Sequence, residues 1–392
     1  MNWDFQFNLP TTIEFGSGKV KLVGEQVKKY GNKVLIVTDK GLAQTGILEK
    51  VTNSLKKENI DYYVFDEVKP NPRDVDCQKA YEQFKDKKIE VLIGLGGGSS
   101  MDTAKAIGTL MTHDGNLSER YGADKLEREI TPLICIPTTA GTGSEVTSFS
   151  VITDTKLKDK MLIFDLNLAP KIALVDPELT LSLPPSITAA TGMDALTHAI
   201  EAYVCNMAEP ISDALALHAI ELIVNSLPEA VENGNNIEAR QNMLIGSLIA
   251  GLAFGNTDLG GVHAMAEPLG GLYDTPHGVA NAIFLPFVFE FNIKANPAKF
   301  AIVAKKLGVS EEYKTEEQIA LKGVHLLKEL SSRIGIPKFS DLNYVNPKDF
   351  EFLAEGAENN ICTIANPRNI TKKDYLELFQ LAYEYKGMDV HV

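Results

Sequence analysis

The sequence is poor in cysteine, and the cysteines that it has are not spaced for a metal site or a disulfide framework. Four occur in 392 residues, none of them in a Cys-x-x-Cys pair: Cys77, Cys135, Cys205 and Cys362. Scattered thiols of this kind are typical of proteins that stay reduced in the cytosol. The first residues also lack the basic start and apolar core of a signal peptide. We therefore expect a cytoplasmic protein.

Long apolar runs and runs of basic residues are absent as well. No apolar stretch reaches the roughly 18 residues that a membrane-spanning helix requires, and the longest candidate, 244–254, contains two glycines and a serine. The chain carries 38 Lys and Arg against 52 Asp and Glu, a formal net charge of −14. An acidic chain without a basic run is a poor partner for nucleic acid or an anionic membrane, so neither is expected.

The first half of the sequence contains a regular alternation of strand and helix patterns. Short apolar runs predict strands at 33–39, 61–66, 90–94, 131–137, 148–153, 160–164 and 172–176. Between the first of these runs, segments 41–58 and 74–87 have the apolar spacing of amphipathic helices. Such alternation is typical of βαβ units and a parallel sheet, so we expect an α/β domain.

The strand patterns stop near Leu183-Pro184-Pro185. Beyond this point the apolar spacing predicts helices at 186–204, 212–224, 237–254, 262–269, 297–307, 316–334 and 371–385. A chain of 392 residues is long enough for two domains. We expect an α/β domain over residues 1–183 and an all-helical domain over 184–392.

Three consecutive glycines follow the predicted strand at 90–94. The stretch is not a Walker loop, because Lys105 stands between two alanines, and Ser99 takes the third position of a G-x-G-x-x-G pattern. Even so, glycines allow backbone N–H groups to approach a phosphate, and Ser99 or Ser100 is placed to cap the helix that follows. The alternative is a tight turn without a ligand.

A second loop follows the predicted strand at 131–137 and is rich in hydroxyl groups, with Thr138, Thr139 and Thr142. Ligands of open α/β sheets bind beyond the carboxyl ends of the strands, so the two loops are expected to converge on a diphosphate. Asp39 ends another predicted strand and is placed to accept hydrogen bonds from ribose hydroxyls.

The second half contains acidic and histidine residues at helical spacing. Asp194 and His198 are four residues apart, as are His263 and Glu267, and His277 follows. Imidazole and carboxylate groups together suit a borderline divalent cation such as Fe²⁺ or Zn²⁺. Taken singly, each histidine is more typical of helix capping or packing than of a metal ligand.

Four stretches taken together resemble the signatures of the iron-containing alcohol dehydrogenase family: GGGSSMDTAKA, PTTAGTGSEVT, GMDALTHAIEAY and HAMAEPLGGLYDTPHG. The resemblance covers nearly the whole chain and points to members that act on propanediol or lactaldehyde. It implies a Rossmann-like nucleotide-binding domain and a helical metal-binding domain, as in dehydroquinate synthase, with a cleft between them. The implied activity is direct hydride transfer between NAD(H) and a small primary alcohol or diol and its aldehyde.

The resemblance also assigns site residues. The positions that match the cofactor site are Asp39, Asn71, Gly97, Gly98, Ser99, Thr138, Thr139, Thr142, Thr147, Phe149, Lys160 and Leu179. The positions that match the metal ligands are Asp194, His198, His263 and His277, and those that match the substrate pocket are Phe254 and Cys362. A carboxylate at Asp39 would repel a 2′-phosphate, so NAD(H) is expected rather than NADP(H). Fe²⁺ is the expected ion, with Zn²⁺ as its competitor, and the family implies a homodimer or larger homo-oligomer.

Glu267 departs from the family pattern, which often has a histidine one helical turn after the third ligand. Glu267 is a candidate proton acceptor, or it only orients His263 and shapes the pocket. With Asp258 nearby in the sequence, it disfavours an anionic substrate. Two related functions remain open at this point: a zinc-dependent glycerol dehydrogenase-like oxidoreductase, and a dehydroquinate synthase-like lyase that holds NAD and a metal.

Overall fold

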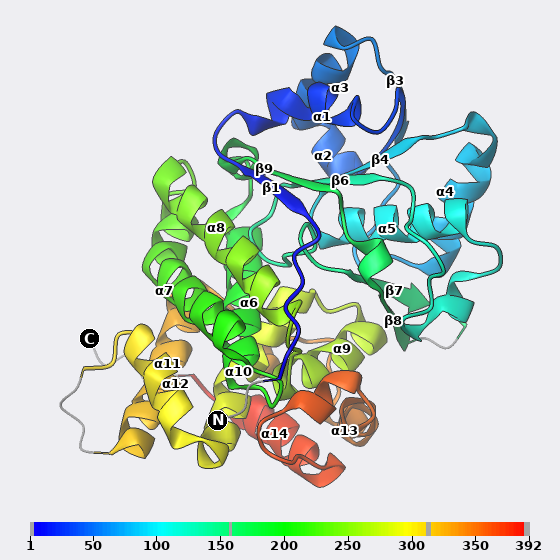
Figure 1. Cartoon of the computed structure of the whole chain (residues 1–392). Coiled ribbons are helices and arrows are strands. Elements are labelled where there is room, and N and C mark those ends of the chain that lie inside the picture. Colours follow the sequence, from blue (N-terminus) through cyan, green and yellow to red (C-terminus); the bar gives the residue numbers. More distant parts are fainter. Residues whose placement is uncertain (1–3, 157–158, 311–314, 388–392) are drawn as a thin grey trace. The chain divides into compact units, whose positions relative to one another are not determined.

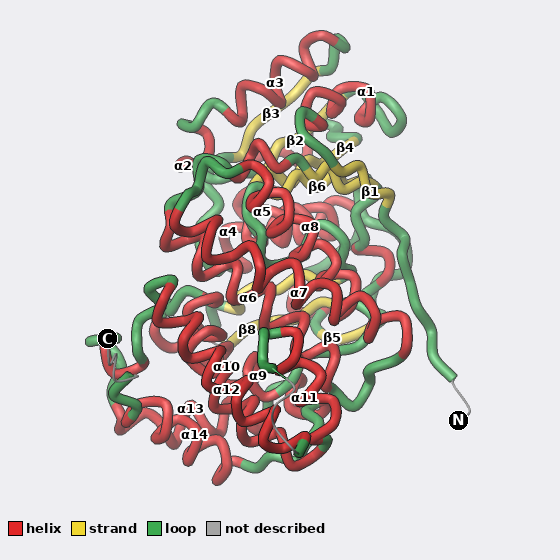
Figure 2. Tube along the Cα trace, turned by 90° about the vertical axis from the view of Figure 1, so that its left-hand side faces the viewer, coloured by secondary structure: helices red, strands yellow, loops and turns green. Residues whose placement is uncertain are grey.

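The computed structural model describes residues 4–156, 159–310 and 315–387, and these form two compact units. The α/β unit is Asn8–Ser182, and the helical unit begins at Leu183 and includes the segment that ends at Phe7. Figure 1 labels most of these elements, with numbers that follow the order of the chain. Among the described residues, all strands belong to the α/β unit (Figure 2).

The α/β unit contains a six-stranded sheet in which every pair of neighbouring strands is parallel. Its order is β1 (Thr12–Phe15), β9 (Ile172–Val175), β6 (Leu133–Pro137), β4 (Val91–Gly96), β2 (Lys33–Val37) and β3 (Asp61–Phe65). The structure confirms five of the predicted strands in this sheet. The edge strand β1 was not predicted, because its alternating polar residues leave only a weak apolar pattern.

Helices cover both faces of this sheet, and the period of two along each strand decides which face a side chain joins. In β2, Val34 and Ile36 pack in one core with residues of α1 (Val23–Val27) and α3 (Ile47–Lys57). Leu35 and Val37 pack in the opposite core, with α4 (Asp74–Phe84) and α5 (Gly98–Thr112). Because apolar residues are needed on both faces, the strand reads as a continuous apolar run.

One predicted helix of this unit is two helices in the structure. The segment 41–58 forms the short α2 (Lys40–Ala43) and then α3, which are separated at Gly46. Gly46 has φ +81°, a left-handed conformation that an α-helix does not contain and that glycine adopts without steric cost. The apolar spacing continues across the break, so periodicity alone did not reveal it.

The predicted strands at 148–153 and 160–164 do not join the main sheet. They are β7 (Phe149–Asp154) and β8 (Asp159–Phe164), an antiparallel pair that forms a three-stranded sheet with β5 (Gly122–Ala123). Residues of this pair extend the core beside α4 and α5, since Ile152, Met161 and Ile163 are buried there.

The described residues of the helical unit form mainly nine α-helices. They are α6 (Pro185–Val204), α7 (Pro210–Glu232), α8 (Ile237–Phe254), α9 (Gly261–Tyr273), α10 (His277–Asn292), α11 (Pro297–Lys306), α12 (Glu316–Arg333), α13 (Phe350–Glu358) and α14 (Lys372–Glu384). The sequence did not predict α10 or α13. Helix α10 is apolar on all sides and contains Pro286, so it shows neither an amphipathic period nor an uninterrupted helical sequence.

Helix α7 extends past its predicted end because the chain continues as a helix through Pro228. By length and composition alone α7 meets the criterion for a membrane span, which the core helices of soluble proteins also meet.

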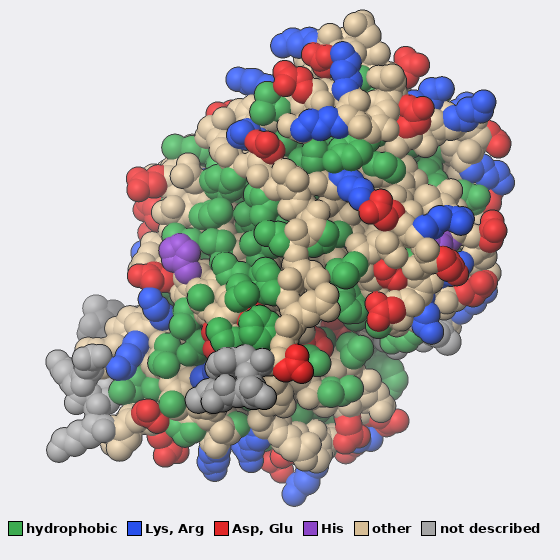
Figure 3. Space-filling model, in the orientation of Figure 1, with side chains coloured by type: hydrophobic (Ala, Val, Ile, Leu, Met, Phe, Trp, Pro, Cys, Tyr) green, Lys and Arg blue, Asp and Glu red, His purple; other side chains and the backbone are tan. Residues whose placement is uncertain are grey.

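On the face drawn in Figure 3, Lys and Arg side chains are interspersed with Asp and Glu side chains.

Candidate active site

The two loops that the sequence singled out, and the strand end that carries Asp39, lie at the same edge of the main sheet. Strands β2, β4 and β6 lie side by side in parallel register, with Val37 opposite Gly94 and Gly96 opposite Pro137. From β2 the chain continues to β3 at one edge of the sheet. From β4, the neighbour of β2 on its other side, the chain continues to β6, toward the opposite edge. The point between β2 and β4 is therefore the topological switch point, where open α/β sheets bind ligands.

The glycines after β4 provide room for the second loop. A Cβ on Gly98 would lie 2.8 Å from Cγ2 of Thr142, and a Cβ on Gly97 would lie 3.2 Å from Oγ1 of Thr139. Both distances are shorter than ordinary carbon contacts. The structure thus brings four of the expected cofactor residues together, and the glycines allow the two loops to approach each other closely.

The expected serine cap of α5 is wrong. The helix begins at Gly98, with Gly97 as its N-cap, and no side chain caps it. Ser99 and Ser100 consequently lie inside the first turn, too late in the chain to act as the N-cap. The first amides of this 15-residue helix are therefore left without a side-chain acceptor, as an anion site requires.

Lys105, which the sequence excluded as a Walker lysine, holds the second loop against α5. Its ammonium group is fully buried and donates to the carbonyl oxygens of Ser144 (2.8 Å) and Phe149 (2.6 Å). The Ser144 hydroxyl in turn donates to Asp102 (2.7 Å). Burial lowers the pKa of Lys105 and raises that of Asp102. This network fixes the loop and has no signal in the sequence, because its partners are about 40 residues apart.

Other cofactor candidates either contact polar or aromatic neighbours or are packed in the core. Lys160 donates to the side-chain oxygen of Asn71 (2.9 Å), and the centroid of the Phe149 ring lies 4.8 Å from that of Phe164. Thr147 is buried next to Lys105. Leu179, by contrast, is 1% exposed and packs in the core of the sheet, so the structure gives it a packing role.

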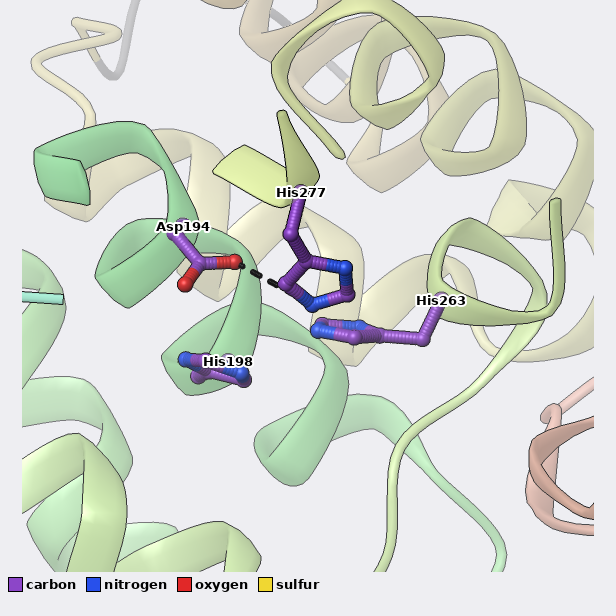
Figure 4. A group of neighbouring side chains, drawn as sticks. All are labelled: Asp194, His198, His263 and His277. Atoms are coloured by element: carbon purple, nitrogen blue, oxygen red, sulfur yellow. Dashed lines mark ion pairs between the residues drawn. The ribbon is translucent and has the colours of Figure 1, made fainter. Parts of the chain in front are cut away.

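In the helical unit, three helices bring the predicted acidic and histidine residues together (Figure 4). Asp194 and His198 lie one turn apart on α6, His263 lies in the first turn of α9, and His277 is the first residue of α10. One ligand atom from each of the four lies within 4.8 Å of all the others. Gly278 makes this approach possible, because a Cβ there would lie 2.3 Å from the carbonyl oxygen of Ala190 on α6.

The four side chains fit a divalent cation. Donors bound to one ion at about 2.1 Å lie roughly 3.5 Å apart in a tetrahedral set, so small side-chain movements suffice for a shared ion. The amide nitrogen of Asn281 donates to Oδ1 of Asp194 (2.7 Å) and lies 3.0 Å from Nε2 of His263 and 3.2 Å from Nε2 of His277. One carboxylate oxygen and two ring nitrogens thus lie around a single amide group, where a cation would find its ligands. The sequence analysis missed Asn281.

The charges of the cluster favour an ionised Asp194. Burial alone would raise the pKa of Asp194, but the neighbouring His198, His277 and His263 outweigh it, and the pKa lies below its ordinary value. A buried carboxylate that stays ionised is a competent ligand for a cation.

The carboxylate that hydrogen-bonds to the ring of His263 is that of Glu201, and not that of Glu267. Nδ1 of His263 lies 2.5 Å from Oε2 of Glu201, which was not among the predicted site residues. The Glu267 carboxylate instead accepts a hydrogen bond from the side-chain amide of Asn360. The spacing of Glu201, three residues after His198 on a predicted helix, was the one signal that could have identified it.

Of the two predicted pocket residues, Phe254 lies beside this cluster and Cys362 lies near acidic groups. The Phe254 ring stacks on His198 with centroids 4.4 Å apart. Burial raises the pKa of the Cys362 thiol well above its ordinary value, and the charges of Glu267 and Asp258 raise it further. Burial also raises the pKa of Asp258 to about 6. The region around Cys362 is therefore acidic and poorly hydrated.

Comparison with known proteins gives the family. Residues 10–177 match the description "Iron-containing alcohol dehydrogenase", and residues 188–383 match "Fe-containing alcohol dehydrogenase family, C-terminal". The chain is 43% identical to 1,3-propanediol dehydrogenase of Citrobacter freundii over 97% of this chain and 99% of the relative. It is 40% identical to NAD-dependent methanol dehydrogenase of Bacillus methanolicus over 96% and 99%.

A solved structure of 1,3-propanediol oxidoreductase has the same fold. It superposes with a TM-score of 0.94 at 40% identity and covers 97% of this chain and 100% of its own. The predicted fold class, the resemblance to propanediol-acting enzymes and the activity as an oxidoreductase are confirmed. The family also implies a metal ion and NAD(H) as cofactors. The chain belongs to the iron-containing alcohol dehydrogenase family.

Proposed function

We propose that the chain interconverts a small, neutral primary alcohol or diol and its aldehyde, with NAD(H) as the hydride carrier. One divalent ion is bound by Asp194, His198, His263 and His277, and the convergence of their ligand atoms is the observation that carries the proposal. Such an ion acts as a Lewis acid toward the substrate oxygen. The ion is Fe²⁺, with Zn²⁺ competing, because imidazole and carboxylate ligands suit both.

The other residues bind and position the reactants. The first turn of α5, which lacks a side-chain cap, and the threonines of the second loop support a pyrophosphate site at the sheet edge. Phe254, packed against His198, and the buried Cys362 line the substrate pocket and limit water near the reacting carbon. A bound nicotinamide would supply or accept the hydride, so the role of the chain's own residues is placement and electrostatics.

A substrate panel tests this function. The metal-loaded protein is assayed by NADH oxidation with butanal, 3-hydroxypropanal and lactaldehyde, and with glyoxylate as an anionic aldehyde. We expect turnover of the neutral aldehydes and little or none of glyoxylate. Glu267, Asp258 and Glu201 are close enough to one another to interact electrostatically, and their negative charges would together repel an anionic substrate. A glycerol dehydrogenase would oxidise glycerol in preference to the simple alcohols, and a lyase would give no net NADH oxidation.

Glu267 is proposed to select against negative charge and not to relay the proton. Glu267→Gln removes the charge and keeps the shape, so kcat/KM for glyoxylate should rise about 10-fold relative to butanal. The rate with butanal and its pH profile should stay unchanged. A loss of the rate with butanal, or a displaced pH profile, would instead make Glu267 a proton-transfer group.

Asp39 is proposed to set the preference for NAD(H). Its carboxylate accepts from the amide of Leu42 (2.9 Å), and Oδ2 lies 3.8 Å from the position of a Cβ on Gly96, at the switch point. Asp39→Asn preserves this N-cap and removes the charge. We expect the ratio of kcat/KM with NADPH to that with NADH to rise at least about 10-fold. A wild-type enzyme that uses NADPH as well as NADH would contradict the assignment.

The proposal includes the organisation and the location of the protein. We place the domain boundary between residues 183 and 184, which the gap between the two family matches, at 177 and 188, supports. Family resemblance supports a homodimer or larger homo-oligomer, which light scattering after size exclusion would measure. A cytoplasmic location is consistent with the four cysteines, all of which are free and buried.

A further inference from the structure

Glu201 connects the helix that carries two of the proposed metal ligands to the helix that carries a third. It lies on α6 and is 4% exposed. One carboxylate oxygen, Oε2, lies 2.5 Å from Nδ1 of His263, and the other, Oε1, accepts from the backbone amide of Val262 (2.7 Å). Both hydrogen bonds therefore join α6 to the first turn of α9.

A second side chain holds the same turn from the C-terminal part of the chain. The side-chain oxygen of Asn366 accepts from the amide of Gly261 (3.0 Å) and from Asn292 (2.8 Å). The Asn366 amide donates back to Asn292 (2.9 Å). The turn has no room for side chains at its start, since a Cβ on Gly260 would lie 3.0 Å from Oε1 of Glu201 and 3.1 Å from Oδ1 of Asn366.

These contacts determine which nitrogen of His263 faces the cluster. A neutral imidazole has one N–H, and a carboxylate can only accept, so Nδ1 carries the hydrogen and Nε2 keeps its lone pair. Nε2 is the atom that lies 3.0 Å from the amide nitrogen of Asn281, in the centre of the cluster. Both partners of Glu201 are donors, so a glutamine could satisfy only one of them with its single oxygen.

We propose that Glu201 is a positioning residue of the metal centre, which fixes the tautomer and place of His263 and thereby sets the affinity for the ion. The inference rests on the proposed metal ligands. Glu201 does not contact the ion or the substrate in this role. Asn366 assists by holding the first amide of α9.

The test is the affinity of the metal-free full-length chain for Zn²⁺, measured by competition with a chelating dye, in the wild type and in Glu201→Gln. We expect a dissociation constant 10- to 100-fold higher in the variant, the usual effect of losing the outer partner of a metal-bound histidine. Thermal unfolding of both metal-free chains shows whether the variant is folded.

Glu209 offers a matched control. It is also 4% exposed, and its two oxygens accept backbone amides at the start of α7, from Ile211 (2.7 Å) and Ser212 (2.7 Å), in contacts that involve no histidine. Glu209→Gln should lower the unfolding temperature and leave the Zn²⁺ affinity within threefold of the wild type.

The outcomes separate the two proposals. If the wild type binds one Zn²⁺ and Glu201→Gln binds it equally well, the positioning role is refuted and the metal site stands. The same holds if both glutamine variants lose affinity equally, because the effect then follows stability alone. If the wild type binds no metal, the proposed function fails, and the role of Glu201 fails with it.

Discussion

Replacement of His263 by alanine is expected to remove metal binding and turnover together. His263 is buried and supplies one of the four converging ligand atoms, so its removal leaves an incomplete ligand set. Loss of an outer partner of a metal-bound histidine already weakens binding about 10- to 100-fold, and loss of the ligand itself should cost more. Metal content per chain and NADH oxidation with butanal, measured on the same sample, check the prediction.

Two further variants make this result specific. His263→Ala also leaves the buried Glu201 carboxylate without one of its two partners, which destabilises the fold. Asp194→Asn avoids that problem, because it keeps the shape and the acceptor for Asn281 while it removes the charge. It should lose metal and activity while remaining folded. His218→Ala, at an exposed position of α7, should change neither. A His263→Ala protein that is metal-free and fully active would refute the ligand assignment.

Glu145→Gln is expected to stabilise the protein at pH 8 and much less at pH 5. Glu145 ends the second loop of the α/β unit and is 1% exposed, and its Oε1 has no hydrogen-bond partner among the described residues. Burial raises the pKa of Glu145 from 4.5 to about 7. The folded chain therefore holds a proton on this carboxyl group over a pH range in which the unfolded chain has released it.

The sign of the effect follows from proton linkage. Between about pH 4.5 and pH 7 the folded state binds more protons than the unfolded state, so the free energy of unfolding falls as the pH rises. Below this range both states are protonated and there is no penalty, and above it the full penalty of ~3 kcal/mol applies. Glutamine carries no charge at any pH, so the variant escapes this loss.

Urea unfolding of both proteins at pH 5 and pH 8 measures the effect. At each pH, the free energy of unfolding of the wild type is subtracted from that of the variant. The two differences are then compared, because any effect of the new amide itself is the same at both pH values. We expect the change between them to be ~2 kcal/mol or more in favour of the variant at pH 8. A stability difference that does not depend on pH would mean that Glu145 is ionised in the folded protein at both values.

Local patterns predicted most of the elements and failed where burial or backbone geometry removed the pattern. Strands β2, β4 and β6 were predictable because residues buried on both faces of a parallel sheet form continuous apolar runs. Helix α10 was not, because residues 280–289 are buried on every side and leave no continuous polar face to define an amphipathic period. The break at Gly46 and the early start of α5 depend on single backbone angles that periodicity does not report.

The sequence by itself determined the family, the order of the loops, and the acidic and imidazole groups available to a metal, because motifs of fixed spacing lie within single elements. Tertiary structure alone decided which of these groups meet. Asn281 and Glu201 contact the predicted ligands from elements up to 87 residues away, and Asn366 holds the first amide of α9 from 105 residues away. Lys105 likewise holds the second loop against α5 only after the sheet has formed. Side-chain contacts between distant segments depend on how helices pack, and no local spacing contains that information.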